Sequence, residues 1–356
     1  MGKEKVVIGM SGGVDSSVAA YLLKKQGYDV VGVTMHIWQE ENSKNGLKAE
    51  EDARRVADTI GIEHRVVHFE EEFRKKVVDY FINEYLSGKT PNPCNVCNRF
   101  IKWECLLNAA REMGAYYVAT GHYARVDKLD NGRFAICNSI TAKKDQTYAL
   151  YNLTQEQLAH TIMPVGGYEK DEIRKIAADI GLDVASKADS QDICFIPDGD
   201  YAGFIRNNCD TIIDEGDFVD REGKILGRHK GITNYTIGQR KGLNLAMGHP
   251  VFVTALDTEK NQVVIGENED LFTKRVEATD FNYMAVEAMK PGQRFIGKIR
   301  YAHKGDWCTV IEASKNHVTV EFDEPVRAIT PGQALVLYEG KYVAGGGSIA
   351  KNGGIF

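Results

Sequence analysis

The fold of this chain is decided by nine residues near its start, Gly9-Met10-Ser11-Gly12-Gly13-Val14-Asp15-Ser16-Ser17. An apolar run, Lys5–Met10, precedes them, and an amphipathic helical pattern, Ser16–Gln26, follows them. A glycine-rich loop between a strand and a helix turns backbone N–H groups toward an anion, and its serines add hydroxyl donors. The stretch therefore predicts a phosphate-binding loop, in which Asp15 fits beside phosphate if a Mg²⁺ ion lies between them.

The loop lacks the two commonest nucleotide-binding fingerprints. It contains neither G-x-x-x-x-G-K-[ST], which brings a lysine to a γ-phosphate, nor G-x-G-x-x-G, which accepts a dinucleotide. The alternative interpretation is a tight strand-to-helix turn capped by serine. Six specified positions between a strand and a helix favour the phosphate-binding interpretation.

The first two hundred residues alternate apolar runs with amphipathic stretches, which predicts an α/β fold with a Rossmann-like parallel sheet. The predicted strands are Lys5–Met10, Asp29–Trp38, His64–Phe69 and Tyr116–Tyr123. The predicted helices are Ser16–Gln26, Leu47–Ile60, Glu70–Leu86, Asn98–Met113, Thr154–Thr161 and Tyr168–Ile180. An Asp130-Asn131-Gly132 turn predicts a hairpin between Tyr123–Lys128 and Arg133–Cys137.

Beyond about residue 205 the helical periodicity fades. Short alternating runs separated by turns appear near the C-terminus, which predicts a β-barrel there. These runs include Phe295–Ala302, Cys308–Glu312 and His317–Phe322. We therefore expect three domains: a catalytic α/β domain at 1–205, a small central module at 206–273 and a C-terminal β-barrel at 274–356.

Composition limits the class of protein. The chain has 356 residues, of which 43% are hydrophobic and 26% charged, with a formal net charge of −6. This mixture is too apolar for a disordered chain and too charged for a membrane protein. The sequence offers neither an apolar run of roughly 18–20 residues nor a signal-peptide core. We expect a globular, cytoplasmic protein that does not bind membranes.

The seven cysteines include a Cys-x-x-Cys pair in a proline-bracketed segment, Pro91-Asn92-Pro93-Cys94-Asn95-Val96-Cys97-Asn98. Structural zinc needs four ligands, and no second pair stands at suitable spacing. A thioredoxin-like redox pair fits the flanking prolines poorly. A third interpretation joins the pair to the distant Cys194, which follows an acidic cluster in the segment 189–196. Because Cys97 is expected near a helix N-terminus, the helix dipole should lower its thiol pKa. Cys105, Cys137, Cys209 and Cys308 lie in ordinary structural settings.

The stretch Ser11–Ser16 resembles the pyrophosphate loop (PP-loop) of the N-type ATP pyrophosphatases, which cleave ATP between its α- and β-phosphates. Together with the cysteines, the chain resembles the bacterial and organellar tRNA-specific 2-thiouridylases nearly from end to end. The further segments that carry this resemblance are Gly121-His122-Tyr123, Lys144-Asp145-Gln146-Thr147-Tyr148, Asp189–Ile196, Thr236–Gly242, Arg300-Tyr301 and Pro331-Gly332-Gln333.

This resemblance implies a reaction, its cofactors and its partners. The family adenylates the wobble uridine of tRNAs that read Lys, Glu and Gln codons, using ATP and Mg²⁺. Sulfur from a donor protein or from sulfide then replaces O2, and AMP leaves. Position by position, the resemblance implies that ATP contacts Gly9, Met10, Ser11, Gly12, Gly13, Val14, Asp15, Ser16, Met35 and Gly121. It implies that tRNA contacts Asn92, Pro93, His122, Lys144, Asp145, Gln146, Arg300, Tyr301 and Gln333.

The resemblance also makes Cys97 the catalytic nucleophile and Cys194 the persulfide carrier. Many members of the family carry aspartate where this chain has Cys94, beside the target base. Three cysteines of this kind also resemble those of other tRNA thiolases that hold a [4Fe–4S] cluster with one open iron. Two sulfur mechanisms follow: a persulfide relay through Cys194 and Cys97, or a cluster on Cys94, Cys97 and Cys194. The spacing slightly favours the cluster.

A basic segment, Arg221–Lys241, carries six Lys or Arg residues against one Glu, with His229 and Tyr235 between them. It is either a tRNA-contacting stripe in the central module or a solvated surface loop. Tyr301 and His303 are candidates for stacking on bases.

Two other functions compete with tRNA thiolation. One is a PP-loop synthetase that adenylates a small metabolite, as GMP synthetase and argininosuccinate synthetase do. The other is a non-catalytic tRNA-binding iron–sulfur protein.

Overall fold

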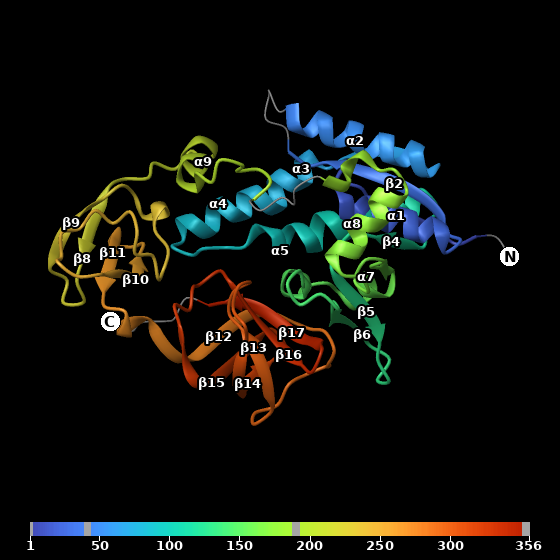
Figure 1. The fold of residues 1–356 in the computed structure, drawn as a ribbon. Helices are drawn as coiled ribbons and strands as arrows, with labels where there is room; N and C mark the ends of the chain where they lie inside the picture. Colours follow the sequence, from blue (N-terminus) through green and yellow to red (C-terminus); the bar gives the residue numbers. More distant parts are fainter. Residues whose placement is uncertain (1–2, 39–43, 187–192, 351–356) are drawn as a thin grey trace.

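The computed structural model describes residues 3–38, 44–186 and 193–350, which form three parts (Figure 1). A parallel sheet with helices on both faces is followed by a small four-stranded sheet and then by a β-barrel. The predicted fold class is therefore confirmed. Within the described residues, we find no helix with the length and apolar character needed to cross a bilayer.

The parallel sheet has the strand order β3-β2-β1-β4-β7. Its strands are β1 (Lys5–Gly9), β2 (Asp29–His36), β3 (Glu63–His68), β4 (Tyr117–Ala119) and β7 (Thr161–Ile162). Sequence analysis predicted the first four, although β4 is shorter than expected. It missed β7, because two residues at the end of a helical pattern carry too little periodicity to reveal a strand.

Alternate residues of β1 face two different cores. Val6 and Ile8 pack against α1 (Val14–Lys25), α2 (Lys44–Ile60) and α8 (Lys170–Asp179). Val7 faces the other side, where Trp103 and Leu106 cover the sheet. This second core continues into the C-terminal barrel through Val336 and Tyr338. A buried strand needs apolar residues on both faces, which explains its continuous apolar run.

Two predicted long helices are interrupted by π-helical turns. The first consists of α3 (Glu70–Phe73), the π turn η1 (Arg74–Val78) and α4 (Asp79–Leu86). The second consists of α5 (Pro93–Cys97), the π turn η2 (Asn98–Cys105) and α6 (Leu106–Glu112). The second helix begins five residues before the predicted start. Asn92 caps it and Pro93 occupies its first turn, where a missing N–H costs nothing.

Shorter elements lie between β4 and β7 and between α8 and the central sheet. They are β5 (Ala124–Lys128), β6 (Phe134–Asn138), η3 (Thr147–Leu150), α7 (Gln155–Ala159), η4 (Asp183–Ser186) and α9 (Tyr201–Asn208). β5 and β6 form the predicted hairpin.

The central sheet has the strand order β10-β11-β8-β9. Its strands are β8 (Gly216–Val219), β9 (Ile225–His229), β10 (Phe252–Asp257) and β11 (Gln262–Gly266). His229 and Tyr235 are buried beside Phe218, with ring centroids 5.1–5.6 Å from it. These two rings belong to the core of the module and do not face a nucleic acid.

Six strands form the C-terminal barrel, and pairing of β12 with β17 closes it. They are β12 (Phe272–Tyr283), β13 (Arg294–Lys298), β14 (Asp306–Ser314), β15 (His317–Arg327), β16 (Ala334–Glu339) and β17 (Tyr342–Ile349). The β5–β6 hairpin joins this sheet where Tyr342 of β17 pairs with Cys137 of β6. Arg133 in the hairpin also donates to the carbonyls of Tyr283 and Met284. The sheet of the barrel therefore extends into the first 205 residues through the β5–β6 hairpin.

Candidate active site

The glycine-rich loop lies where the strand order of the parallel sheet reverses. β1 ends at Gly9, and its neighbours on the two sides are β2 and β4. The carboxyl ends of parallel strands meet at one edge, and ligands bind where the order reverses. Met35 near the end of β2 lies beside Gly9, since a Cβ there would be 3.4 Å from Met35 Cε. Gly121 follows β4, and a Cβ on it would be 2.6 Å from the Ser16 nitrogen. The predicted ATP contacts thus lie together.

The loop has a backbone that favours glycine at position 12. Gly12 has φ +67°, and a Cβ on it would be 2.5 Å from the carbonyl oxygen of Ala49 in α2. Gly13 is the N-cap of α1, and no described side chain caps that helix. The first amides of α1 are therefore available to an anion. The Met10 and Val14 side chains are buried in the sheet core, so only their backbone can contact a nucleotide.

The loop carboxylate is paired with a lysine from another helix. Lys170 Nζ, in α8, lies 2.8 Å from each oxygen of Asp15, and the Tyr123 hydroxyl donates to Oδ1 at 2.7 Å. The Lys170 side chain is 11% exposed. Sequence analysis missed Lys170, since nothing around it marks it as functional. The role of Asp15 as a Mg²⁺ ligand stays a prediction, and it requires Lys170 to release a carboxylate oxygen.

The three cysteines named from the sequence lie in one region. Cys97 belongs to the same apolar cluster as Phe195 and Ile196, which follow Cys194 in the chain. Cys94 and Cys194 are exposed, and both are close enough to Cys97 to raise its pKa. All seven cysteines of the chain are free thiols. Residues 189–192, the acidic part of the predicted motif, lie outside the described residues.

The prediction that Cys97 has a lowered pKa was wrong. Cys97 is the last residue of α5, whereas Cys94 lies in the first turn and donates its backbone N–H to Asn92 Oδ1 at 3.0 Å. The positive end of the helix dipole is therefore at Cys94. Burial raises the pKa of Cys97 to about 12, and the charge of Lys102 acts in the opposite direction. Cys97 is a protonated thiol at neutral pH.

Lys102 is a second residue that sequence analysis missed. It lies in η2, five residues after Cys97, and its charge opposes the increase in pKa that burial causes at Cys97 and Cys194. Burial of the Cys194 thiol raises its pKa, although other parts of the residue are exposed. Burial, followed by the Lys102 charge, holds the pKa of His122 well below its usual range. His122 is therefore neutral, with Nδ1 2.8 Å from Thr120 Oγ1.

Several predicted tRNA contacts hold the barrel against the catalytic domain. The Tyr301 hydroxyl donates to the Asp145 carbonyl at 3.0 Å. Gln333 Nε2 donates at 2.7 Å to the carbonyl of Thr90, close to the cap residue Asn92. These bonds bring the barrel next to the segment that carries Cys94 and Cys97.

Other predicted tRNA contacts are engaged within the protein. The Asp145 carboxylate accepts from the Ser139 and Thr147 amides, and Gln146 Oε1 accepts from the Tyr123 amide. Arg300 donates to the Arg327 carbonyl. Lys144 is exposed and Pro93 is buried. These bonds give Asp145, Gln146 and Arg300 a structural role in addition to any contact with tRNA.

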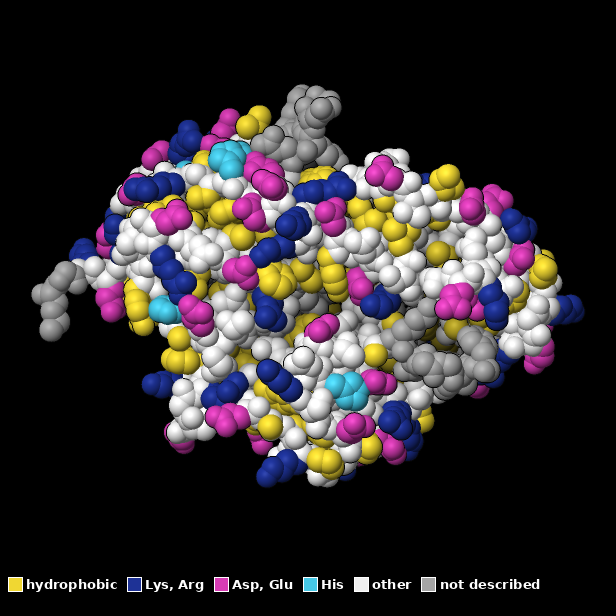
Figure 2. All heavy atoms as spheres, turned by 180° about the vertical axis from the view of Figure 1, so that it is seen from behind, with side chains coloured by type: hydrophobic (Ala, Val, Ile, Leu, Met, Phe, Trp, Pro, Cys, Tyr) yellow, Lys and Arg dark blue, Asp and Glu magenta, His cyan; other side chains and the backbone are white. Residues whose placement is uncertain are grey.

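The basic segment 221–241 is partly neutralised by acidic neighbours. Arg221 pairs with Asp270 at 2.8 Å and Arg228 with Asp217 at 2.9 Å. On the face drawn in Figure 2, basic and acidic side chains are interspersed and no continuous basic band forms. The His303 side chain is 13% exposed and bound to Asp306, so it is poorly placed for stacking, whereas Tyr301 is half exposed.

Known proteins match this chain over 98% of its length. The family described as tRNA methyl transferase HUP domain matches residues 4–198. A PRC-barrel domain follows at 203–267 and an aminomethyltransferase β-barrel domain at 273–349. A tRNA-specific 2-thiouridylase of Lachnoclostridium phytofermentans is 57% identical over 98% of this chain and 100% of its own length. The enzyme of that name from Clostridioides difficile is 52% identical over 98% of this chain and 99% of its own length. The one from Acetivibrio thermocellus is 48% identical over 98% of this chain and 100% of its own length.

Replacing Lys170 by methionine should destabilise the protein, because the partly buried Asp15 carboxylate would lose its cation. We expect the free energy of unfolding, measured by urea denaturation, to fall by about 1–3 kcal/mol. Lys175→Met, at an exposed site of the same helix, should change it by less than about 0.5 kcal/mol. Equal effects of the two substitutions would show that the ion pair adds no stability.

The pKa of Cys97 predicts an order of thiol alkylation. At about pH 8 we expect iodoacetamide to modify Cys94 quickly, since it is exposed, and Cys97 slowly, since burial keeps its thiol protonated and thiolate is the reacting form. Mass spectrometry of peptides gives both rates. Cys308 is a matched control, since burial in the barrel also raises its pKa to about 12. Rapid alkylation of Cys97 while Cys308 stays protected would contradict the raised pKa.

Proposed function

The chain belongs to the family of tRNA-specific 2-thiouridylases, and from this premise we propose how its residues divide the reaction between them. The enzyme is a tRNA sulfurtransferase that uses ATP to replace O2 of the wobble uridine by sulfur. The description of the first domain names a methyl transferase, whereas the relative that matches over its full length is named a thiouridylase. We follow the name of the full-length relative. The observation that supports this division of roles is that one domain carries both the glycine-rich loop before α1 and three thiols, Cys94, Cys97 and Cys194, close enough to interact electrostatically.

In the first half-reaction, uridine O2 attacks the α-phosphorus of ATP and pyrophosphate leaves. The uncapped amides at the start of α1 and the loop serines would hold the phosphates. A Mg²⁺ ion bound beside Asp15 would neutralise phosphate charge. Lys170 lies against the same carboxylate and adds a positive charge where pyrophosphate charge develops.

In the second half-reaction, sulfur attacks C2 of the adenylated uridine and AMP leaves. In the persulfide version, the terminal sulfur on Cys194 forms the bond to C2. Cys97 then attacks the Cys194 sulfur, which releases 2-thiouridine and leaves a Cys97–Cys194 disulfide. A thiol reductant must restore the pair. The burial of Cys97 keeps it protonated, and Lys102 is the cation that would favour its thiolate.

In the alternative version, Cys94, Cys97 and Cys194 would hold a [4Fe–4S] cluster, which supplies an open iron for sulfide. The donor set fits this group, since three thiols from two segments meet in one region. Metal binding would displace the protons that burial retains on Cys97 and Cys194. No disulfide forms in this version, because sulfide is already fully reduced.

We propose that the substrates are the tRNAs that read Lys, Glu and Gln codons. A sulfur-donor protein or sulfide would supply the sulfur. We propose that the reaction takes place in the cytoplasm, where these tRNAs read codons. Asn92, Pro93 and Cys94 would lie at the target base, and Thr90, just before them in the chain, accepts a hydrogen bond from the barrel residue Gln333.

The division of roles predicts separable defects. The assay contains unmodified tRNA, ATP and Mg²⁺ under anaerobic conditions, with a persulfide donor as the sulfur source for the relay or sulfide for the cluster. Asp15→Ala should lose pyrophosphate release. Cys97→Ser should still release pyrophosphate but form no 2-thiouridine. Pyrophosphate assays and nucleoside mass spectrometry measure the two steps, and Cys308→Ser should leave both unchanged. Thiolation by Cys97→Ser would overturn the role of that residue.

The two sulfur versions differ in metal content. The cluster predicts about four iron and four acid-labile sulfide per chain in protein prepared without oxygen. It also predicts that Cys94→Ala loses both the metal and thiolation. The relay predicts negligible iron, normal thiolation by Cys94→Ala and a Cys97–Cys194 disulfide after one turnover without reductant.

A further inference from the structure

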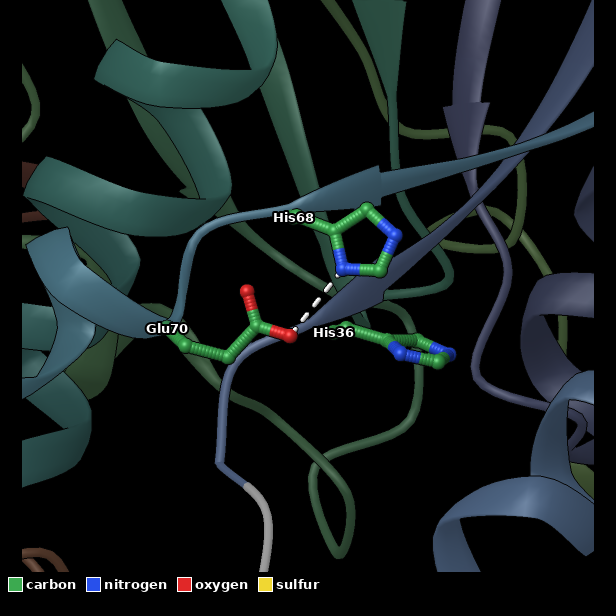
Figure 3. Close-up of side chains that lie close together, drawn as sticks. All are labelled: His36, His68 and Glu70. Carbon is green, nitrogen blue, oxygen red and sulfur yellow. Dashed lines mark hydrogen bonds and ion pairs between the residues drawn. The ribbon is translucent and has the colours of Figure 1, made fainter.

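A second group of ligating side chains lies at the same edge of the sheet, outside the thiol region. His36 ends β2 and His68 ends β3, and the two are register partners in the parallel pair. Glu70 begins α3 two residues after His68 (Figure 3). One ligand atom from each lies within 4.8 Å of the others, and no other such trio occurs among the described residues.

The ring of His36 is oriented by a carboxylate behind it. His36 Nε2 lies 2.9 Å from Glu50 Oε2, and Arg54 holds the other Glu50 oxygen at 2.6 Å. The His36 and Glu50 side chains are 17% and 18% exposed. Since Nε2 is engaged by Glu50, Nδ1 is the atom left for the cluster. A histidine ligand that gives its other ring nitrogen to a carboxylate is the usual arrangement at a metal ion.

The ligand atoms of His68 and Glu70 are already about as far apart as two ligands of one metal ion. His68 Nδ1 and Glu70 Oε1 are 3.1 Å apart. Bonds of about 2.0–2.1 Å in a tetrahedron place ligand atoms roughly 3.3 Å apart. The ring centroids of His36 and His68 are 5.0 Å apart, and the ligand atoms of the trio lie within 4.8 Å of one another, so binding one ion requires the His36 ring to move closer to the other two ligands.

We propose that His36, His68 and Glu70 bind one divalent transition-metal ion of the zinc class, with Glu50 orienting His36. Two imidazoles and one carboxylate suit such an ion, whereas Mg²⁺ and Ca²⁺ prefer oxygen ligands alone. Three protein ligands leave a fourth position for water. The bound ion ties together the ends of β2 and β3 next to Met35, a predicted ATP contact, and this role is independent of the thiols.

The test titrates the full chain with Co²⁺ and follows its visible d–d absorption. The starting protein is the Cys94→Ser/Cys97→Ser/Cys194→Ser variant, so that thiolates do not compete for the ion. We expect one equivalent to bind without sulfur-to-cobalt charge transfer, and Zn²⁺ to displace it. His68→Ala in this background should abolish binding, and Glu50→Gln should weaken it by about 10–100-fold.

The matched control is His249→Ala, which removes a surface histidine paired with a single glutamate, Glu267, at 2.8 Å. It should bind Co²⁺ as the starting protein does. Zn²⁺ should also raise the melting temperature of the starting protein but not of the His68→Ala variant. The proposal is overturned if no stoichiometric Co²⁺ binding occurs, or if His68→Ala binds as tightly as the control.

Discussion

The parallel pairing of β1 with β2 on one side and β4 on the other is the constraint on which the functional edge depends. It brings the ends of three strands to one edge of the sheet: the glycine loop after β1, the Met35-His36 pair at the end of β2 and Gly121 after β4. The approach is so close that only a residue without a Cβ fits at Gly121. The nucleotide site, as we propose it, is thus produced by backbone pairing before any side chain contributes.

The register of one helix determines the chemistry of the thiols. Asn92 caps α5 and Pro93 is its first residue, so Cys94 lies in the first turn of the helix. Cys97 lies about one turn later, where it is buried among apolar side chains. A thiol in such a place is protected from oxidation while it stays protonated, and it becomes a strong nucleophile once the proton is lost. Lys102 is the nearby charge that favours this loss. The sulfur chemistry therefore depends on where one helix begins.

Sequence reasoning reached the parts of the protein that depend on local pattern. Apolar runs predicted β1 to β4, and glycines with serines predicted the loop. It failed where distant segments meet. Nothing in the sequence pairs Lys170 with Asp15, or the Tyr301 hydroxyl with the Asp145 carbonyl. The basic segment likewise gave no sign that Tyr235 is buried. The pKa of Cys97 was mispredicted for the same reason, since burial is a tertiary property that overrode the helix dipole.

The attachment of β6 to β17 has a consequence for domain exchange. A barrel joined only through its linker can be traded between genes by recombination at that linker. Here the barrel shares a core with the α/β domain, and Arg133 binds the carbonyl oxygens at the end of β12. A chimaera that imports a foreign barrel must therefore import a compatible hairpin from the middle of another domain. Recombination at a single crossover point would break this join, so the two parts must be inherited together.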